Sequence, residues 1–403
     1  MIAHLCKMVW NRKRTNFLIG VELFLSFLVL CAVLTVCIYF ADNYRRPLGF
    51  TYDDVWHIDI DKHGPVSIEA ENELKRQIVL AVKGFDEVEA TAYVTQVPFK
   101  GAQRGAAMYA DNGQRILNKG CVATDDLHKV LGLEIVEGRW FDRGDEGLRG
   151  VPVVINRSLA EIAFGQDSPV GKEIERFTLE DMEKRSGDDV SKVALFTVVG
   201  VIDDFRGDDF APPAPFAFRR ASGRFVPWDL LVKLKPGTKA VFGERLLARL
   251  QSTAKEWIFS IKPLSEHRES NAKLYLTFLV IGGVVAVLLI AMVSLGMVGV
   301  LWQNVTQRIG EIGLRRALGG ATRYIAAQFV GELLVVTTAA VVLATALIVQ
   351  LPLSDAIEFV RREVYLGGLC AAAALIYLLV VLCALYPSWL ASRVQPAEAL
   401  HYE

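Results

Sequence analysis

Four residues with metal-binding side chains alternate along one short predicted strand: His57, Asp59, Asp61 and His63. Side chains at every second position of a strand point to the same face of the sheet, and imidazole and carboxylate groups are common zinc ligands. The polar face of a solvated strand shows the same alternation. Because the sequence offers no second cluster of ligands, we interpret these residues as a solvated face and predict no metal site.

Two further segments resemble ligand-binding loops without meeting their requirements. The acidic stretch Asp203–Asp209 lacks the ligand register and the closing Glu of a calcium loop, so we predict a solvated turn. The stretch Gly165–Glu173 has one residue too many between its glycines for a phosphate-binding loop, and Glu173 stands where magnesium binding needs Ser or Thr. We therefore predict no nucleotide site, no cofactor and no catalytic residue in this chain.

The composition of the 403-residue chain is that of a membrane protein, because 52% of its residues are hydrophobic and they concentrate towards the two ends. Its 44 basic and 45 acidic residues nearly balance, which gives no reason to expect a nucleic-acid partner. Of the 6 cysteines, only Cys121 lies in the long soluble region, so we expect that region to fold without an internal disulfide.

Four apolar runs predict transmembrane helices. The first, Phe17–Phe40, follows a basic N-terminus and is too long for the core of a cleavable signal peptide, so we expect a retained span with a cytoplasmic N-terminus. The second, Leu274–Trp302, covers about 43 Å as a helix against about 30 Å for the hydrocarbon core, so we expect it to protrude as a stalk. The third and fourth runs are Leu333–Leu351 and about Leu366–Tyr386.

The predicted spans are poor in charge and rich in small residues. Glu22 is the one charged residue of the first span, and we favour a structural role for it. Small residues permit close approach of helices, and we assign helix packing to Gly296, Gly299, Gly367 and Gly368. This pattern indicates a packed bundle that transmits movement more than a pore for hydrophilic solutes.

The region between the first two spans predicts an α/β domain in two parts. One strand–helix–strand unit comprises Val55–Asp61, Ser67–Phe85 and Val88–Phe99. A second begins with the strand Asp229–Lys235 and continues with a helix from about Lys239 to Trp257. Two such units around a long insertion predict a split ferredoxin-like subdomain interrupted by a mixed α/β subdomain. The predicted fold class is thus a four-span α-helical bundle plus an α/β extracytoplasmic domain.

These predictions divide the chain into consecutive segments. In order, they are a cytoplasmic N-terminus (1–16), the first span (17–40), the extracytoplasmic domain (41–270), a stalk with the second span (271–303), a cytoplasmic loop (304–323), the third span (324–351), a short outer loop (352–365), the fourth span (366–387) and a cytoplasmic tail (388–403). Within the extracytoplasmic domain, about 51–100 and 195–265 form the split subdomain, and about 101–194 form the insertion.

The cytoplasmic loop lies within the segment Gln307–Gln328, which joins the second and third spans. Short loops rich in Lys and Arg stay in the cytoplasm, so its arginines fix the orientation of the flanking spans. Its apolar residues recur at helical spacing opposite a polar face with a Glu311–Arg315 pair, and Gly319 and Gly320 mark the end of the helix. Such an amphipathic helix either rests on lipid headgroups or docks against a soluble partner.

Several motifs of the chain resemble those of one permease superfamily. They are RIGEIGLRRALGGATRYIAAQFVGELL in and after the cytoplasmic loop, GRWF, VVINRSLAEIAFG, PVGKEI and FTVVGVIDDFR in the soluble region, and YPSWLASRVQPAEALH near the C-terminus. Together with the order of spans, they resemble the MacB, LolC/LolE and FtsX superfamily of ABC transporter permeases. The resemblance implies a contact with a cytoplasmic ATPase, made by Arg308, Glu311, Arg315 and Arg316. It also implies a position at the base of the third span for Gln328 and Glu332.

The resemblance implies a permease subunit of MacB type in a bacterial inner membrane, with both termini cytoplasmic and the large domain periplasmic. Such a subunit couples ATP hydrolysis to movement of its periplasmic domain, which drives export or extraction of a substrate. Because the chain begins shortly before its first span, we expect a separate ABC ATPase dimer to hold ATP and magnesium. A second permease subunit, identical or related, and a MacA-like periplasmic adaptor are the other expected partners.

Two alternative functions occur within the superfamily. One is an FtsX-like mechanical regulator of a periplasmic cell-wall hydrolase, and the other is a sensor module that works with a histidine kinase. The size and two-part plan of the soluble domain favour the MacB or LolC/LolE branch. In each case we predict a non-catalytic subunit.

Overall fold

The computed structural model describes residues 13–63, 67–101, 105–109, 114–177, 194–221, 226–306, 322–350 and 360–393. The chain divides into two compact units. The first comprises Met1–Asp42 together with Tyr275–Glu403, and the second is Asn43–Leu274.

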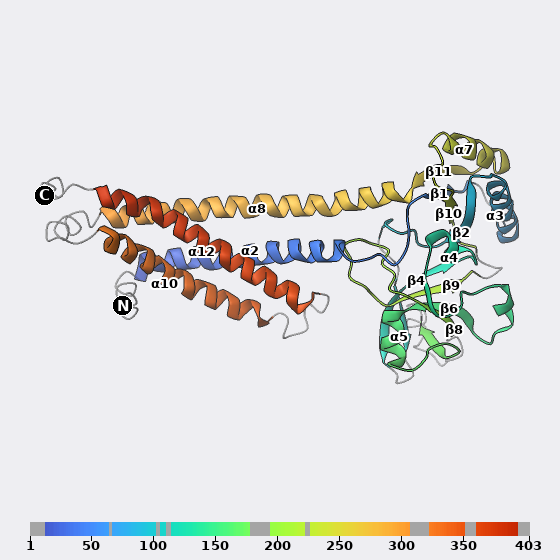
Figure 1. Cartoon of the computed structure of the whole chain (residues 1–403), viewed down its shortest axis with the longest axis horizontal. Coiled ribbons are helices and arrows are strands. Elements are labelled where there is room, and N and C mark those ends of the chain that lie inside the picture. Colours follow the sequence, from blue (N-terminus) through green and yellow to red (C-terminus); the bar gives the residue numbers. More distant parts are fainter. Residues whose placement is uncertain are drawn as a thin grey trace, which may run out of the picture. The chain divides into compact units, whose positions relative to one another are not determined.

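Four long helices build the described part of the first unit: α2 (Lys13–Tyr44), α8 (Leu264–Thr306), α10 (Thr322–Ile348) and α12 (Arg362–Arg393). Each is long and apolar enough to cross a membrane. α10 and α12 lie side by side (Figure 1). Apolar residues from all four helices form one core, which contains Ile19, Leu23, Phe27, Leu30, Ala286, Val293, Met297, Leu333, Val336, Ala340, Ala344, Ile348, Ala372, Ile376, Val380 and Ala384.

The helix α8 begins in the second unit and continues without a break into the first. Its 43 residues correspond to about 65 Å at 1.5 Å per residue. It is therefore one continuous rod through the region for which the sequence predicts a stalk.

The second unit contains the split ferredoxin-like arrangement. Strands β11 (Ile258–Pro263), β1 (Val55–Asp61), β10 (Asp229–Leu234) and β2 (Val88–Val94) lie in that order, all antiparallel. Helices α3 (Ile68–Lys83) and α7 (Phe242–Thr253) lie side by side against one face of this sheet. Alternation places the apolar residues of each strand on that face, where the core contains Ile58, Ile60, Tyr93, Leu230, Val232, Ile78, Val82, Leu246 and Leu250. The predicted α/β fold class is confirmed.

Several boundaries of strands and helices differ from the sequence predictions, and two of these differences have a clear local cause. β2 ends at Val94, whereas the predicted strand reached Phe99. Pro98 has no amide proton to donate, and Phe99 adopts a positive φ of 64°, so the chain turns there. The predicted helix from Ser67 begins one residue later, because the Ser67 side chain accepts a hydrogen bond from the amide of Ala70 and caps α3.

The insertion, which in the structure extends past its predicted end at about 194, adds a second group of strands: β4 (Arg115–Ala123), β3 (Gly105–Tyr109), β7 (Glu173–Phe177), β8 (Ala194–Ile202), β6 (Val151–Asn156) and β9 (Phe216–Arg220). Each pairs with the next, and β9 pairs in parallel with β4, so the strand pairings close into a ring. β5 (Ile135–Gly138) pairs with β8. Short helices α4 (Leu127–Leu131) and α5 (Arg157–Phe164) and the 3-10 turn η1 (Arg143–Gly147) complete the insertion. Residues 178–193 of the insertion lie outside the described residues.

The two parts of the second unit share a core. The sheet face opposite α3 and α7 contributes Val55, Ala90, Ala92 and Leu231, which pack with aromatic residues of the insertion. Those aromatic residues are Trp140, Phe141, Phe205, Phe216 and Phe218. Protein interiors are close-packed and resist deformation. The shared core therefore makes the second unit move as one rigid body.

Candidate functional site

The residues predicted to contact an ATPase, Arg308, Glu311, Arg315 and Arg316, lie outside the described residues. Gln328 belongs to α10, and Glu332 is a half-buried residue of the same helix. The roles assigned to these residues therefore stay predictions.

The four glycines assigned to helix packing have different surroundings. A Cβ atom on Gly368 would lie 2.0 Å from Thr35 Oγ1 and 2.8 Å from Thr35 Cα, so α12 approaches the backbone of α2 there. A Cβ on Gly296 would lie 2.7 Å from a carboxylate oxygen of Glu22, and one on Gly367 would make an ordinary contact of 3.5 Å with Ile38. A Cβ on Gly299 would meet nothing within 4 Å.

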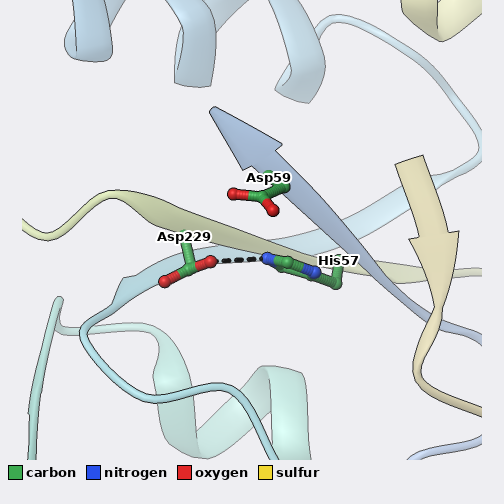
Figure 2. Close-up of side chains that lie close together, drawn as sticks. All are labelled: His57, Asp59 and Asp229. Atoms are coloured by element: carbon green, nitrogen blue, oxygen red, sulfur yellow. Dashed lines mark hydrogen bonds and ion pairs between the residues drawn. The ribbon is translucent and has the colours of Figure 1, made fainter. Parts of the chain in front are cut away.

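A cluster of titratable side chains lies where β1, β10 and the start of α8 meet (Figure 2). His57 is buried, with 1% of its surface exposed. Its Nε2 atom lies 2.8 Å from Asp229 Oδ1, and its Nδ1 atom lies 3.0 Å from His267 Nε2. The Lys100 ammonium donates to Asp59 Oδ2 and to Asp229 Oδ1, both at 3.0 Å.

This cluster combines the ligand types of a divalent-metal site with an internal cation. Ligand atoms of His57, Asp59 and Asp229 lie within 4.8 Å of one another, and one imidazole with two carboxylates suits a transition metal. Lys100 already places its charge against both carboxylates. Burial alone would raise the pKa of Asp229, but hydrogen bonds from His57 and Lys100 hold that pKa below its usual range. A metal ion would therefore have to displace the ammonium.

The sequence-predicted alternation along β1 is only partly reflected in this cluster. His57 and Asp59 take part, whereas Asp61 and His63 are exposed and belong to no metal-ligand group among the described residues. Asp229 comes from another strand, 172 residues away. The prediction that the chain holds no metal stays a prediction.

The acidic stretch Asp203–Asp209 is a structured loop and not the solvated turn that the sequence predicted. Arg206 and Asp209 are buried, with 4% and 2% of their surfaces exposed. Asp204 accepts hydrogen bonds from Asn156 and Ser158 and so ties the loop to α5. A guanidinium offers five N–H donors in a planar fork, so a buried Arg206 can be satisfied by backbone carbonyls alone. We call residues 206–211 the junction loop.

Arg206 fastens the end of α2 to the junction loop. Its guanidinium donates to the carbonyl oxygens of Asn43, Arg46 and Pro47, at 2.9, 2.9 and 3.2 Å. It also donates to the carbonyl oxygens of Asp209 and Ala211 in the loop itself, at 2.6 and 2.9 Å. In addition, the Asn43 side chain donates to the carbonyl oxygen of Phe210 at 3.2 Å. The segment Asn43–Pro47 is thus hydrogen-bonded to the Arg206 side chain and, through the Asn43 side chain, to the backbone of the junction loop.

Arg268, in the second turn of α8, fastens that helix to the same loop. Its Nε donates to Asp209 Oδ2 at 2.9 Å, and its Nη2 donates to Asp209 Oδ1 at 2.9 Å. It also hydrogen-bonds to the hydroxyl of Tyr52, and its guanidinium lies 4.7 Å from the Tyr52 ring centre and 5.6 Å from that of Tyr44. One turn later, Asn271 donates to Asp208 Oδ1 at 3.1 Å.

The junction loop therefore joins the last residues of α2 to the first turns of α8 inside the second unit. Its polar groups are backbone carbonyls, the carboxylates of Asp208 and Asp209, two guanidiniums and the side-chain amides of Asn43 and Asn271, and they bind one another. Such an arrangement fixes the position and direction of helices.

Comparison with known families agrees with this two-part plan. The model of the MacB-like periplasmic core domain matches residues 28–248, and that of the FtsX-like permease C-terminal domain matches residues 283–396. The chain belongs to the MacB/FtsX superfamily of ABC transporter permeases. The predicted family is confirmed, and the chain is a membrane protein with an extracytoplasmic domain.

Individual relatives are distant. The macrolide export ATP-binding/permease protein MacB of Bdellovibrio bacteriovorus is 24% identical over 282 residues, which cover 66% of this chain and 41% of that protein. The uncharacterized ABC transporter permease YvrN of Bacillus subtilis is 23% identical over 292 residues, which cover 69% of each. Among solved structures, the periplasmic region of MacB from Actinobacillus actinomycetemcomitans matches with a TM-score of 0.38 and 14% identity, over 54% of this chain and 92% of that one.

The chain spans less than half the length of the MacB proteins that it matches first.

Proposed function

We propose that this chain is the permease subunit of a MacB-type mechanotransmission ABC transporter. A separate cytoplasmic ATPase binds and hydrolyses ATP with magnesium, and the resulting movement of the membrane helices displaces the extracytoplasmic domain. That displacement drives export or extraction of a substrate. In this proposal the chain itself is non-catalytic.

The junction loop is the observation that supports this function most directly. A domain that merely hung from two flexible linkers would not follow movements of the membrane helices. Here Arg206 and Arg268 fasten both connections, Asn43–Pro47 and the first turns of α8, to one loop through buried hydrogen bonds. The loop leads into the shared core through Phe205, so a displacement of the helices is passed to the whole domain.

The comparisons support the same proposal. The printed name of the Bdellovibrio relative combines ATP binding, a permease and macrolide export in one protein. An export function for this chain extends that description to a relative of low identity. We further propose that the subunit pairs with a second permease subunit, identical or related, that both termini and the loop with Arg308, Glu311, Arg315 and Arg316 face the cytoplasm, and that a MacA-like adaptor binds outside.

In a second candidate function, the same displacement of the extracytoplasmic domain has a different effect. The C-terminal match to FtsX-like permeases is compatible with mechanical regulation of a periplasmic cell-wall hydrolase. Identification of the proteins bound on the outer side distinguishes the two, because a hydrolase replaces the adaptor in the second case. A histidine kinase as the main partner would indicate a sensor module instead.

The proposal is tested by purifying the tagged chain from native membranes and measuring ATP hydrolysis. We expect an ABC ATPase to co-purify, and we expect Glu311→Arg or Arg315→Glu to abolish stimulation of its ATPase activity by the permease at normal expression and insertion. Lys255→Glu, a charge reversal at an exposed residue of the extracytoplasmic domain, is the matched control and should leave stimulation unchanged. A chain that purifies without any ATPase, in detergent and in nanodiscs, would contradict the proposal.

A further inference from the structure

The contacts of the junction loop form a continuous chain from α2 to α8. It runs from the carbonyl oxygen of Asn43 through the guanidinium of Arg206 to the backbone of Asp209, and from the Asp209 carboxylate to Arg268. Tyr44, the last residue of α2, stacks on Phe210 of the loop with ring centres 5.8 Å apart. The end of α2 and the start of α8 are thus held as one piece.

We propose that Arg268 is the positioning residue through which a displacement of α8 reaches the extracytoplasmic domain, and that Arg206 makes the end of α2 move with it. This inference rests on the proposed transport function and names the residues that carry its movement. In this proposal the acidic junction loop couples two membrane helices to one domain.

The geometry of α8 explains why Arg268 has this task. Leu264, the first residue of the helix, is fully buried in the shared core and acts as a pivot. A single buried point lets a helix swivel. Arg268 lies about one turn further along, and its two-pronged contact with Asp209 supplies a second fixed point. Two points define a direction, so α8 cannot tilt without tilting the domain.

The neighbouring residue His267 provides a weaker attachment. It makes one hydrogen bond to His57, at 3.0 Å, and burial lowers the pKa of His267 to about 4, so the His267 ring is uncharged at neutral pH. Arg268 instead forms an ion pair with Asp209, whose side chain is 2% exposed. Charge-assisted, bidentate hydrogen bonds are both stronger and more directional than neutral ones. We therefore assign transmission of the α8 displacement to Arg268, and we use His267 as the control residue.

Removal of the Arg268 side chain should abolish the coupling of α8 to the extracytoplasmic domain without unfolding that domain. Neither Arg268 nor Asp209 belongs to the apolar clusters that hold the second unit together. Arg268→Ala therefore leaves the core intact while it frees the direction of α8. Arg268→Lys keeps the charge but loses the planar fork, so it should restore coupling in part. Asp209→Asn weakens the same contact from the other side and provides an independent variant if Arg268→Ala is poorly expressed.

The experiment measures movement of the domain in the full chain bound to its ATPase, in nanodiscs. Spin labels are placed at Ser252→Cys on α7 and at Gln350→Cys at the end of α10, both exposed, with the other reactive cysteines replaced. The distance distribution between the labels is compared in ADP and in ATP with vanadate, and ATPase activity is measured on the same samples.

We expect the native sequence to show a nucleotide-dependent shift of this distribution. Arg268→Ala should keep ATPase activity but lose the shift, Arg268→Lys should recover part of it, and His267→Ala should shift as the native protein does. A full shift in Arg268→Ala and Asp209→Asn would overturn the inference while leaving the proposed function intact. Absence of any shift in the native sequence would instead overturn the proposed function itself.

Discussion

Lys100 Nζ lies 3.0 Å from Asp229 Oδ1, the same carboxylate oxygen that lies 2.8 Å from His57 Nε2. An ionised carboxylate only accepts hydrogen bonds, so His57 must carry a proton on Nε2. When His57 is neutral, its Nδ1 atom must then accept from His267. This chain of donors and acceptors is complete without a metal because Lys100 provides the positive charge.

Removal of that charge should turn the cluster into a metal site. Lys100→Met keeps an unbranched side chain as far as Cε, removes the ammonium, and leaves Asp59 and Asp229 facing His57 without a cation. We expect this variant to bind one Co²⁺ or Zn²⁺ per chain at least about tenfold more tightly than the native protein, equivalent to about 1.4 kcal/mol. Calorimetry and the visible spectrum of Co²⁺ measure the affinity and the ligand type.

The double variant Lys100→Met with His57→Ala is the control for this site. It retains both carboxylates but lacks the imidazole, so metal affinity should fall back to the native level. Equal metal binding in the single and double variants would show that the ion binds elsewhere. Unchanged affinity in Lys100→Met would show that Lys100 does not compete with metal.

The Arg139–Asp145 pair predicts how stability depends on pH. Asp145 is 2% exposed, and its carboxylate accepts from Arg139 and from the amide of Asp142, which lowers the pKa of Asp145. A lowered pKa in the folded state stabilises the protein above the unfolded pKa of about 3.9, and this contribution is lost as pH falls through the folded value. We expect Asp145→Asn to cost about 1.5–3 kcal/mol at pH 7, the range for hydrogen bonds to charged groups.

The pH dependence distinguishes this contribution from a simple packing defect. The difference in unfolding free energy between native protein and Asp145→Asn should shrink below about pH 4 as Asp145 becomes protonated. Thermal unfolding followed by tryptophan fluorescence, from pH 7 to pH 3, measures it. Asp167→Asn is the matched control, because that carboxylate is 78% exposed in its pair with Lys172 and exposed pairs contribute about 0–1 kcal/mol. A pH-independent difference would rule out the proposed linkage.

Local patterns were sufficient to predict most of the fold. Alternation identified β1 and β10, and helical spacing identified α3, because one side of each element faces the core and that constraint is visible in the sequence. The four apolar runs likewise identified the four long helices. The closed ring of strands in the insertion was not predictable, since the parallel pairing of β4 with β9 joins segments far apart in the chain.

The junction loop shows where local patterns mislead. A stretch with four aspartates and one arginine has the composition of a solvated turn, and nothing local reveals that Arg206 will be enclosed by backbone carbonyls from Asn43 to Pro47. A weak signal was present. Phe205 and Phe210 lie on either side of Arg206–Asp209, and large apolar side chains at both ends of such a short charged segment indicate that it lies against a core.

Only half of the titratable cluster could be predicted from the sequence, because local patterns do not show which distant residues come together. The spacing of His57 and Asp59 on one strand predicts that they share a face, and they do. Asp229 and Lys100 reach them only because β10 pairs with β1 and because the chain turns at Phe99 and Gly101, both with positive φ. The tertiary structure, and not the local sequence, therefore places the Lys100 ammonium against the carboxylates that a metal ion would otherwise bind.

The glycines of the helical bundle provide a graded test of packing. Gly368→Ala would place a methyl group 2.8 Å from Thr35 Cα, a backbone atom that cannot rotate away, so α2 and α12 must separate. We expect a loss of about 1–3 kcal/mol, typical of overpacking. For Gly296→Ala the nearest atoms are those of the Glu22 carboxylate, the far end of a flexible side chain that can change its rotamer, so this variant should cost less. Gly299→Ala meets nothing within 4 Å and, because alanine favours helix by about 0.5–1 kcal/mol over glycine, should be neutral or stabilising. Thermal unfolding of the three detergent-purified variants measures this order, and equal effects at Gly368 and Gly299 would show that close contact between α2 and α12 does not contribute to stability.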